Sequence, residues 1–372
     1  MPILLLGKDM KIIHSSDIGL GRSFPGLKSA GDRLRAEVKT TFSKIIDYTI
    51  EQKADLLIIA GNLFDTVDIS KNLQDFVIRE LARLKSTQAV ILPGKKDPCT
   101  DGSFWRSWNS HQEYKHIHVF ANPKNPVFNL NELNCRVYGL FSRADEKPGA
   151  FNLPPKPADD KILHVGVMCE PPESAGALLK KANFEFDYVA LGGDFSFRDL
   201  TATGINAAYC GSPERLDFGQ IEAGNFAVVE INSQKQLTIA KKQIGQINWR
   251  SEEIKARDIL SNNDLIERLK MIADPNLLLR VTLTGLALFE AELSPLYAEN
   301  TLKGDFLYLE IVDEMKVLPE NVSEVKVSEK TLLGQYIKVM AKDIGEAAEV
   351  QKQRLEKSLK IGYALLQGRE IW

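Results

Sequence analysis

Four apolar runs in the N-terminal part of the chain each end at a glycine turn that carries polar side chains. They lie within residues 11–21, 56–65, 90–97 and 187–194. Short apolar runs rich in Ile, Leu and Val indicate buried strands. In α/β folds, binding and catalytic residues gather at the carboxyl ends of the strands. We therefore expect the polar residues of the four turns to meet in one shared site.

The segments between these strands predict the rest of a first domain. Apolar residues recur at helical spacing over residues 28–53 and 70–85, so the chain to residue 92 has the βαβ pattern of parallel strands. Short strands between residues 119 and 167 have the Pro and Asn turns of antiparallel additions. A short helix and a hairpin follow, over residues 173–182, 226–231 and 237–242. The pattern predicts an α/β fold with two sheets between helices.

Beyond residue 246 the strand-and-turn pattern changes. Alternating and amphipathic segments outline a small α/β unit, with helices at 264–272 and 289–299 and strands at 277–284 and 306–312. From residue 330 the chain is mainly helical. We therefore predict domains at residues 1–245, 246–325 and 326–372. The apolar stripe of the tail indicates either docking to a partner helix pair or packing onto the chain's own cap.

Bulk composition narrows the class of protein. The chain has 372 residues, a net charge of −3, 44% hydrophobic and 26% charged residues, which is ordinary for a soluble globular protein. Because the net charge gives no attraction for nucleic acid, DNA binding would need a local basic patch. No apolar run reaches membrane-spanning length, and the four cysteines form no C-x-x-C pair. We expect a cytoplasmic protein with reduced thiols and no membrane partner.

The polar turns carry motifs in a recognisable order. They read D-I-G at residues 17–19, G-N-L-F-D at 61–65, G-K-K-D at 94–97, VGVMCE around Cys169 and G-G-D-F at 192–195. This order resembles the D-x-H, G-D-x-x-D, G-N-H-D, lone His and G-H-x-H motifs of the SbcD-type DNA repair nucleases, in the calcineurin-like metallophosphoesterase superfamily. Residues 209–219, YCGSPERLDFG, resemble the segment that closes the nuclease domain.

The resemblance implies a fold, a chemistry and partners. The fold is a four-layer α/β/β/α sandwich with a small α/β cap that helps to recognise DNA and a helical tail. The chemistry is phosphodiester hydrolysis at two divalent ions, such as Mn²⁺, held by oxygen and imidazole ligands. The partners are DNA, an SbcC-like coiled-coil ATPase and a second copy of the chain.

Most metal-ligand positions implied by the resemblance hold residues that do not bind metal. Gly19, Lys95, Lys96, Gly193 and Phe195 stand where ligands are expected, and a protonated lysine has no lone pair to donate. The vestigial ligand candidates are Asp17, Asn62 and Cys169, while Asp97 keeps its place in the third motif. The apolar surroundings of His14 and His164 indicate core histidines. With so few ligands left, no cofactor is expected, or Mn²⁺ or another divalent ion if the chain is active.

Two functions remain open on the sequence. The leading hypothesis is a nuclease homologue that has lost catalysis and serves as a DNA-binding or scaffolding subunit with the ATPase. The alternative is an active metal-dependent exonuclease or phosphoesterase with an atypical or single-metal centre. A small-molecule phosphoesterase is a weaker third option. Phosphate or DNA binding is assigned to the candidates Lys95, Lys96, Arg22 and Arg215.

Two further expectations concern details of this site. One of the two lysines, Lys95 or Lys96, is expected to pair with Asp17 and so to supply the missing positive charge. The aromatic residues between positions 98 and 118 predict either a base-stacking surface or packing of a long loop onto the core or onto a second copy of the chain.

Overall fold

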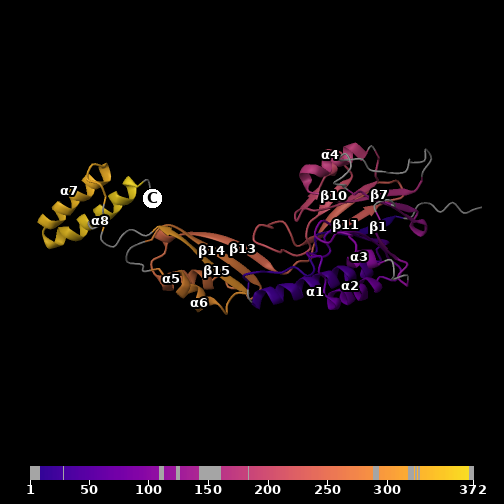
Figure 1. Cartoon of the computed structure of the whole chain (residues 1–372), viewed down its shortest axis with the longest axis horizontal. Helices are drawn as coiled ribbons and strands as arrows, with labels where there is room; N and C mark the ends of the chain where they lie inside the picture. Colours follow the sequence, from indigo (N-terminus) through magenta and orange to yellow (C-terminus); the bar gives the residue numbers. More distant parts are fainter. Residues whose placement is uncertain are drawn as a thin grey trace, which may run out of the picture. The chain divides into compact units, whose positions relative to one another are not determined.

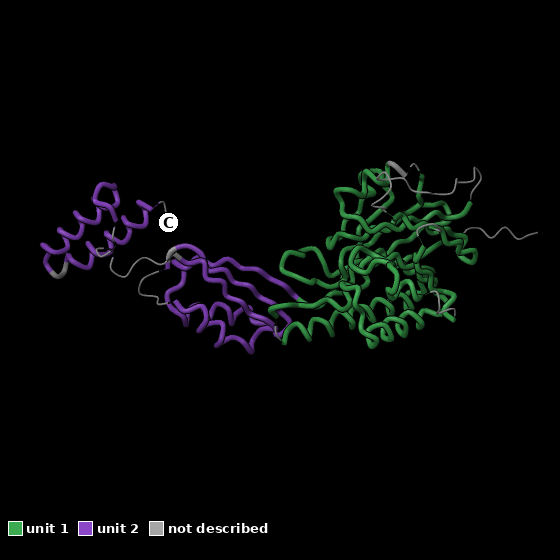
Figure 2. Tube along the Cα trace, in the orientation of Figure 1, with its two compact units in different colours: residues 1–247 green, residues 248–372 purple. Residues whose placement is uncertain are grey.

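The computed structural model describes residues 9–27, 29–108, 113–122, 126–141, 161–182, 184–287, 293–316, 322, 325 and 327–367. The chain forms two compact units, Met1–Ile247 and Asn248–Trp372 (Figure 2).

A six-stranded sheet forms one half of the first unit. Its strands, in spatial order, are β12 (Leu237–Gln243), β11 (Asn225–Ile231), β1 (Met10–Ser15), β2 (Leu56–Ala60), β3 (Gln88–Leu92) and β4 (Ile117–Val119). Strands β1, β2, β3 and β4 are parallel, and the predicted hairpin β11–β12 is antiparallel. The helices α1 (Ser29–Glu51) and α2 (Lys71–Ala82) make the crossovers that parallel neighbours require.

A second six-stranded sheet forms the other half. Its spatial order is β5 (Val127–Leu130), β6 (Cys135–Gly139), β7 (Leu163–Cys169), β8 (Tyr188–Gly192), β10 (Ala207–Cys210) and β9 (Phe197–Asp199). The antiparallel expectation for residues 119–167 is correct for β5–β6 and wrong for β6–β7, which is parallel. The connection from β6 to β7 is long enough for a crossover, which short-strand patterns do not reveal.

The two sheets pack face to face and are covered by helices on their outer sides. Fully buried residues from both sheets, among them Ile12, Ile58, Val167 and Ala190, form one apolar cluster. Helices α1 and α2 cover one side and α4 (Pro172–Ala182) covers the other (Figure 1). A Cβ at Gly192 would overlap the Ala60 carbonyl oxygen, so the sheets nearly touch at their carboxyl ends. The first unit is therefore the α/β/β/α sandwich that the sequence led us to expect.

The second unit contains a parallel three-stranded sheet. Strands β13 (Asn248–Lys255), β14 (Leu277–Leu286) and β15 (Tyr308–Lys316) alternate with α5 (Asn262–Lys270) and α6 (Pro295–Leu302). Strand β13 was not predicted, because its polar composition hides the alternation. The predicted helix at 289–299 begins later, at Pro295, and residues 288–292 lie outside the described part of the chain.

The C-terminal segment forms a helical hairpin. Helices α7 (Leu332–Glu346) and α8 (Glu349–Leu366) pack through Ile337, Leu359 and Tyr363, together with Val322. Hence much of the predicted apolar stripe faces α7. A separate domain boundary near residue 326 stays a prediction. Within the residues that the structure describes, no helix combines the length and apolarity needed to span a membrane.

Candidate functional site

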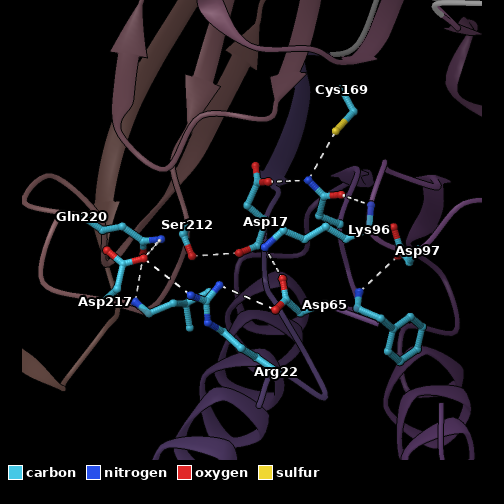
Figure 3. A network of polar contacts seen from close by, with 12 residues as sticks. Asp17, Arg22, Asp65, Lys96, Asp97, Cys169, Ser212, Asp217 and Gln220 are labelled. Carbon is cyan, nitrogen blue, oxygen red and sulfur yellow. Dashed lines mark hydrogen bonds and ion pairs between the residues drawn. The ribbon is translucent and has the colours of Figure 1, made fainter. Parts of the chain in front are cut away.

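The carboxyl ends of the strands bring the motif residues together. Asp17 follows β1, Asn62 follows β2, Lys96 follows β3, Cys169 ends β7 and Gly193 follows β8. Hydrogen bonds join Asn62 to Asp17, Lys96 and Cys169 (Figure 3). The Gly193 N–H also donates to Asp17. Residues from both sheets thus converge on a single carboxylate, that of Asp17.

The carboxylate of Asp17 is buried and has hydrogen-bond donors on both oxygens. Asn62 Nδ2 donates to Oδ1 over 2.7 Å, while Ser16 Oγ and the Gly193 N–H each donate to Oδ2 over 2.8 Å. Burial raises the pKa of Asp17, and these hydrogen bonds and the charge of Lys96 act in the opposite direction. The donors come from the protein, so the carboxylate is satisfied without a metal ion.

The backbone around Asp17 adopts left-handed conformations that aim these donors. Asp17 and Asn62 have φ of 51° and 53°, and Gly193 has φ of 92°. Asp and Asn tolerate this region better than most residues, and glycine does so without strain. The Asp17 N–H donates to the Gly61 carbonyl, and the Ser212 hydroxyl donates to the Asp17 carbonyl.

The second buried carboxylate, Asp97, also accepts three hydrogen bonds from the protein. Its Oδ1 accepts from the Gly94 N–H over 2.7 Å, and its Oδ2 accepts from the Phe64 N–H and from Trp105 Nε1, each over 3.1 Å. Burial raises the pKa of Asp97 to about 7, against the effect of these three donors. Asp97 thus fixes the loop after β3 onto the segment after β2 and onto α3 (Phe104–Ser107).

The two lysines of the third motif form ion pairs with other carboxylates. Lys95 Nζ lies 2.9 Å from Glu170 Oε2, and Lys96 Nζ pairs with Asp65 and lies 5.9 Å from the Phe195 ring centroid. The expected ion pair with Asp17 is therefore wrong. Lys96 acts on Asp17 through its charge, which lowers the pKa of Asp17 against the effect of burial.

The arginines assigned to phosphate or DNA binding also contact groups of the chain itself. Arg22 lies 3.6 Å from Asp65 and 3.5 Å from Asp217, which accepts a hydrogen bond from Gln220 (Figure 3). Arg215 donates to the Ile221 carbonyl. These contacts tie the segment 209–219 to the turns after β1 and β2. Phosphate binding by these cations stays a prediction.

A model of the calcineurin-like phosphoesterase family matches residues 10–190, which include β1, β2, β3 and β7 and most of β8. These residues belong to the calcineurin-like phosphoesterase family. The match contains Asp17, Asn62, Asp97 and Cys169, and it identifies most of the first unit as a phosphoesterase domain.

Curated relatives of the phosphoesterase domain include DNA repair proteins. "DNA double-strand break repair protein Mre11" of Sulfurisphaera tokodaii is 29% identical over 57% of this chain and 56% of that protein. "Uncharacterized metallophosphoesterase YhaO" of Bacillus subtilis is 24% identical over 43% of this chain and 40% of that protein. Another Mre11, of Saccharolobus solfataricus, is 26% identical over 70% of this chain and 72% of that protein. The chain spans about half the length of the first two relatives.

A solved structure, TT1561 of Thermus thermophilus, aligns with 62% of this chain and 98% of its own. Its TM-score is 0.40 and its sequence identity is 11%.

Family membership implies dependence on divalent metals in general, and the donor set of this domain does not fit a two-metal centre. Across the described residues, no three His, Cys, Asp or Glu side chains are grouped so that they could hold a metal ion. Burial raises the pKa of the Cys169 thiol well above its ordinary value, so the sulfur stays protonated. Asn62 directs its amide nitrogen, which has no free lone pair, at Asp17.

The aromatic segment after the third motif packs into the phosphoesterase domain. Phe104, Trp105 and Trp108 are buried and contact one another, and the first two also contact Phe64. For these side chains the base-stacking interpretation is wrong and the packing interpretation is correct. His111 lies outside the described residues.

One functional candidate that the sequence did not reveal is Glu214, in the segment 209–219. Its buried side chain accepts from Thr41 Oγ1 over 2.7 Å and from the Gln246 and Ile247 N–H groups over 3.0 Å each. Ser212 Oγ lies within hydrogen-bond distance of both the Asp17 and the Glu214 carbonyl oxygens. Glu214 therefore links the Asp17 turn, α1 and the last residues of the first unit. The available signal was an acidic residue directly after the Gly-Ser-Pro turn of this segment.

The two strand histidines occupy the core of the phosphoesterase domain. His14 Nδ1 lies 2.8 Å from Tyr188 Oη, and His164 Nδ1 lies 2.7 Å from Tyr138 Oη. Both histidines are fully buried, and burial lowers the pKa of His14 to about 3. Their side chains contact core tyrosines, as expected for core histidines.

The depressed pKa of His14 predicts a loss of stability in mild acid. In the folded protein His14 stays neutral down to about pH 3, whereas in the unfolded chain it binds a proton below its ordinary pKa of 6.5. Stability from this residue is therefore present above pH 6.5 and is lost as the pH falls. Between pH 7 and pH 5 the loss is about 2 kcal/mol.

Urea unfolding of the wild type and of His14→Phe at several pH values isolates this contribution. The free energy of unfolding of the wild type, relative to that of the variant, should fall by about 2 kcal/mol from pH 7 to pH 5. A difference that stays constant over this range contradicts the prediction.

Proposed function

We propose that this chain is a catalytically inactive, nuclease-like subunit of DNA double-strand-break repair, which binds DNA or scaffolds a complex with a coiled-coil ATPase. Similarity to two proteins named as Mre11 supports the repair context. The observation that supports the loss of catalysis is the set of three hydrogen bonds that the buried Asp17 carboxylate accepts from Asn62, Ser16 and Gly193.

The proposal follows from what two-metal hydrolysis requires. Paired cations activate a water molecule and neutralise the phosphate, and both need carboxylate lone pairs that point at the metal. In this domain those lone pairs accept hydrogen bonds, and the ammonium of Lys96 supplies the nearby positive charge. A divalent cation would have to displace donors and approach a fixed ammonium.

The alternative is an active enzyme with an atypical or single-metal centre. One observation favours it: Asp17, Asn62 and Cys169 remain in contact, with 3.6 Å between Asn62 Nδ2 and Cys169 Sγ. Rotation of the Asn62 amide would present its oxygen beside the Asp17 carboxylate. This function requires Mn²⁺ or another divalent ion.

We assign binding of the ATPase to the C-terminal hairpin of α7 and α8. Leu332, Val339, Leu365 and Leu366 remain exposed on α7 and α8, while Leu359 and Tyr363 hold the hairpin together. Deleting residues 351–372 would remove Leu359 and Tyr363 as well, so a paired substitution of Leu332 and Val339 by aspartate is the sharper test.

The deciding experiment measures Mn²⁺ binding by calorimetry, cleavage of linear duplex DNA in Mn²⁺, and DNA binding in EDTA, all on the purified full chain. We expect DNA binding that survives EDTA, no Mn²⁺ uptake, and no cleavage above that of Asp17→Asn. Mn²⁺ uptake together with cleavage that Asp17→Asn abolishes would overturn the proposal in favour of the active enzyme. Co-purification of the ATPase should be lost in the Leu332→Asp, Val339→Asp variant and kept in Lys338→Asp, a matched charge change on α7.

A further inference from the structure

The centre of the phosphoesterase domain is closed by the backbone as well as by side chains. We propose that Gly193 and Asn62 are permanent hydrogen-bond donors to Asp17. Restoring the family's metal-ligand side chains therefore does not restore a two-metal site. The inference rests on the proposed function, and it adds that the loss of the two-metal site is due in part to the backbone conformation after β8.

Gly193 is the key position in this closure. Its φ of 92° turns its N–H toward Asp17 Oδ2, at 2.8 Å. A Cβ at this position would lie 3.1–3.2 Å from backbone atoms of Glu170. The Glu170 backbone is itself held, because its N–H donates to the Gly192 carbonyl and its carbonyl accepts from the Tyr209 hydroxyl. A histidine at Gly193 therefore has to move the backbone and take the N–H away from Asp17.

Gly19 repeats the same constraint in a weaker form. It has φ of 73°, and a Cβ there would lie 2.8 Å from Leu216 Cδ1. The end of a leucine side chain can shift, but the left-handed backbone still disfavours a residue with a Cβ. Both glycines that stand at histidine positions of the resembled motifs thus have backbones that strain a histidine.

Asn62 completes the closure by donating where a bridging carboxylate would accept. Its Nδ2 donates to Asp17 Oδ1, and its Oδ1 accepts from the Lys96 N–H over 3.1 Å. A carboxylate at this position would face that of Asp17 without a cation between them, so the two charges would repel. The site can regain metal ligands only by losing the hydrogen bonds that now hold it.

The test uses the full chain and Mn²⁺ alone. The first variant restores all seven positions: Gly19→His, Asn62→Asp, Lys95→Asn, Lys96→His, Cys169→His, Gly193→His and Phe195→His. We expect it to bind fewer than two Mn²⁺ ions per chain at saturation, as measured by calorimetry with elemental analysis. Two bound ions overturn the inference.

A second pair of variants decides the question even if the seven-position variant fails to fold. Gly204 has φ of 80° and no atom within 4 Å of an added Cβ, so Gly204→Ala measures the cost of the left-handed backbone alone. We expect it to lower Tm by roughly 2–4 °C. Gly193→Ala should lower Tm at least twice as far, because it also disturbs Glu170 and the bond to Asp17. Equal decreases in Tm for Gly193→Ala and Gly204→Ala overturn the inference. Mn²⁺ uptake and cleavage by the wild type would instead refute the proposed function, so the two failures are distinguishable.

Discussion

Replacing Asp17 with alanine is expected to lower the free energy of unfolding by about 3 kcal/mol, because it leaves three buried donors without an acceptor. The donors are Asn62 Nδ2, Ser16 Oγ and the Gly193 N–H. Each unsatisfied buried donor costs about 1–3 kcal/mol, and relief from burying a charge offsets part of the sum. Urea unfolding at pH 7 in EDTA measures the loss.

A control variant and a second condition separate the loss of these hydrogen bonds from the loss of a carboxylate or of a bound metal. Asp101→Ala removes a carboxylate that is 99% exposed, and it should change stability by no more than about 0.5 kcal/mol. Repeating the Asp17→Ala measurement in Mn²⁺ should give the same loss, because protein donors, and not a metal, hold the carboxylate. A loss below about 1 kcal/mol, or one that appears only in Mn²⁺, contradicts the assignment.

The second large effect is expected at Glu214. Glu214→Ala removes the acceptor of Thr41 and of the Gln246 and Ile247 N–H groups, and should cost about 2–3 kcal/mol. Amide hydrogen exchange at Gln246 and Ile247 should also accelerate by more than the loss of global stability explains. The reason is that, among the contacts of the described residues, both N–H groups donate to Glu214 Oε1 and to no other acceptor.

Glu214→Gln is the matched control for this prediction. Glutamine keeps the shape and an oxygen for the two backbone donors, and the Thr41 hydroxyl can reverse its role and accept from the new amide. The loss should therefore be about 1 kcal/mol or less. Equal losses for the two variants would show that the charge of Glu214, and not its hydrogen-bond geometry, holds the end of the first unit.

Together these effects describe a centre whose polar residues now stabilise the domain. In a two-metal enzyme the carboxylates at the sheet edge repel one another until cations bind. Here Asp17 and Asp97 each accept three donors, and Lys96 and Arg22 pair with Asp65. These residues therefore stabilise the phosphoesterase domain through hydrogen bonds and ion pairs.

Hydrophobic periodicity alone was enough to predict most of the secondary structure of the first unit. The runs that became β1, β2 and β3, and the helical stripes that became α1 and α2, have strong periods because one face or the whole strand is buried. Through the resemblance, the turn motifs also predicted that lysines and glycines replace metal ligands. These features depend on residue type and local spacing.

Only the tertiary structure decided which groups hold the carboxylates. Gly193 reaches Asp17 through a backbone N–H across 176 positions of sequence, and its direction depends on a φ angle that no side-chain pattern reveals. The preference of Lys96 for Asp65, the bond from Trp105 to Asp97 and the donors to Glu214 likewise depend on how loops from different strands meet. The sequence by itself determined which residues lie at the carboxyl ends of the strands, because strands follow local periodicity. Packing determined the hydrogen-bond partners of these residues, because hydrogen bonds are short and directional.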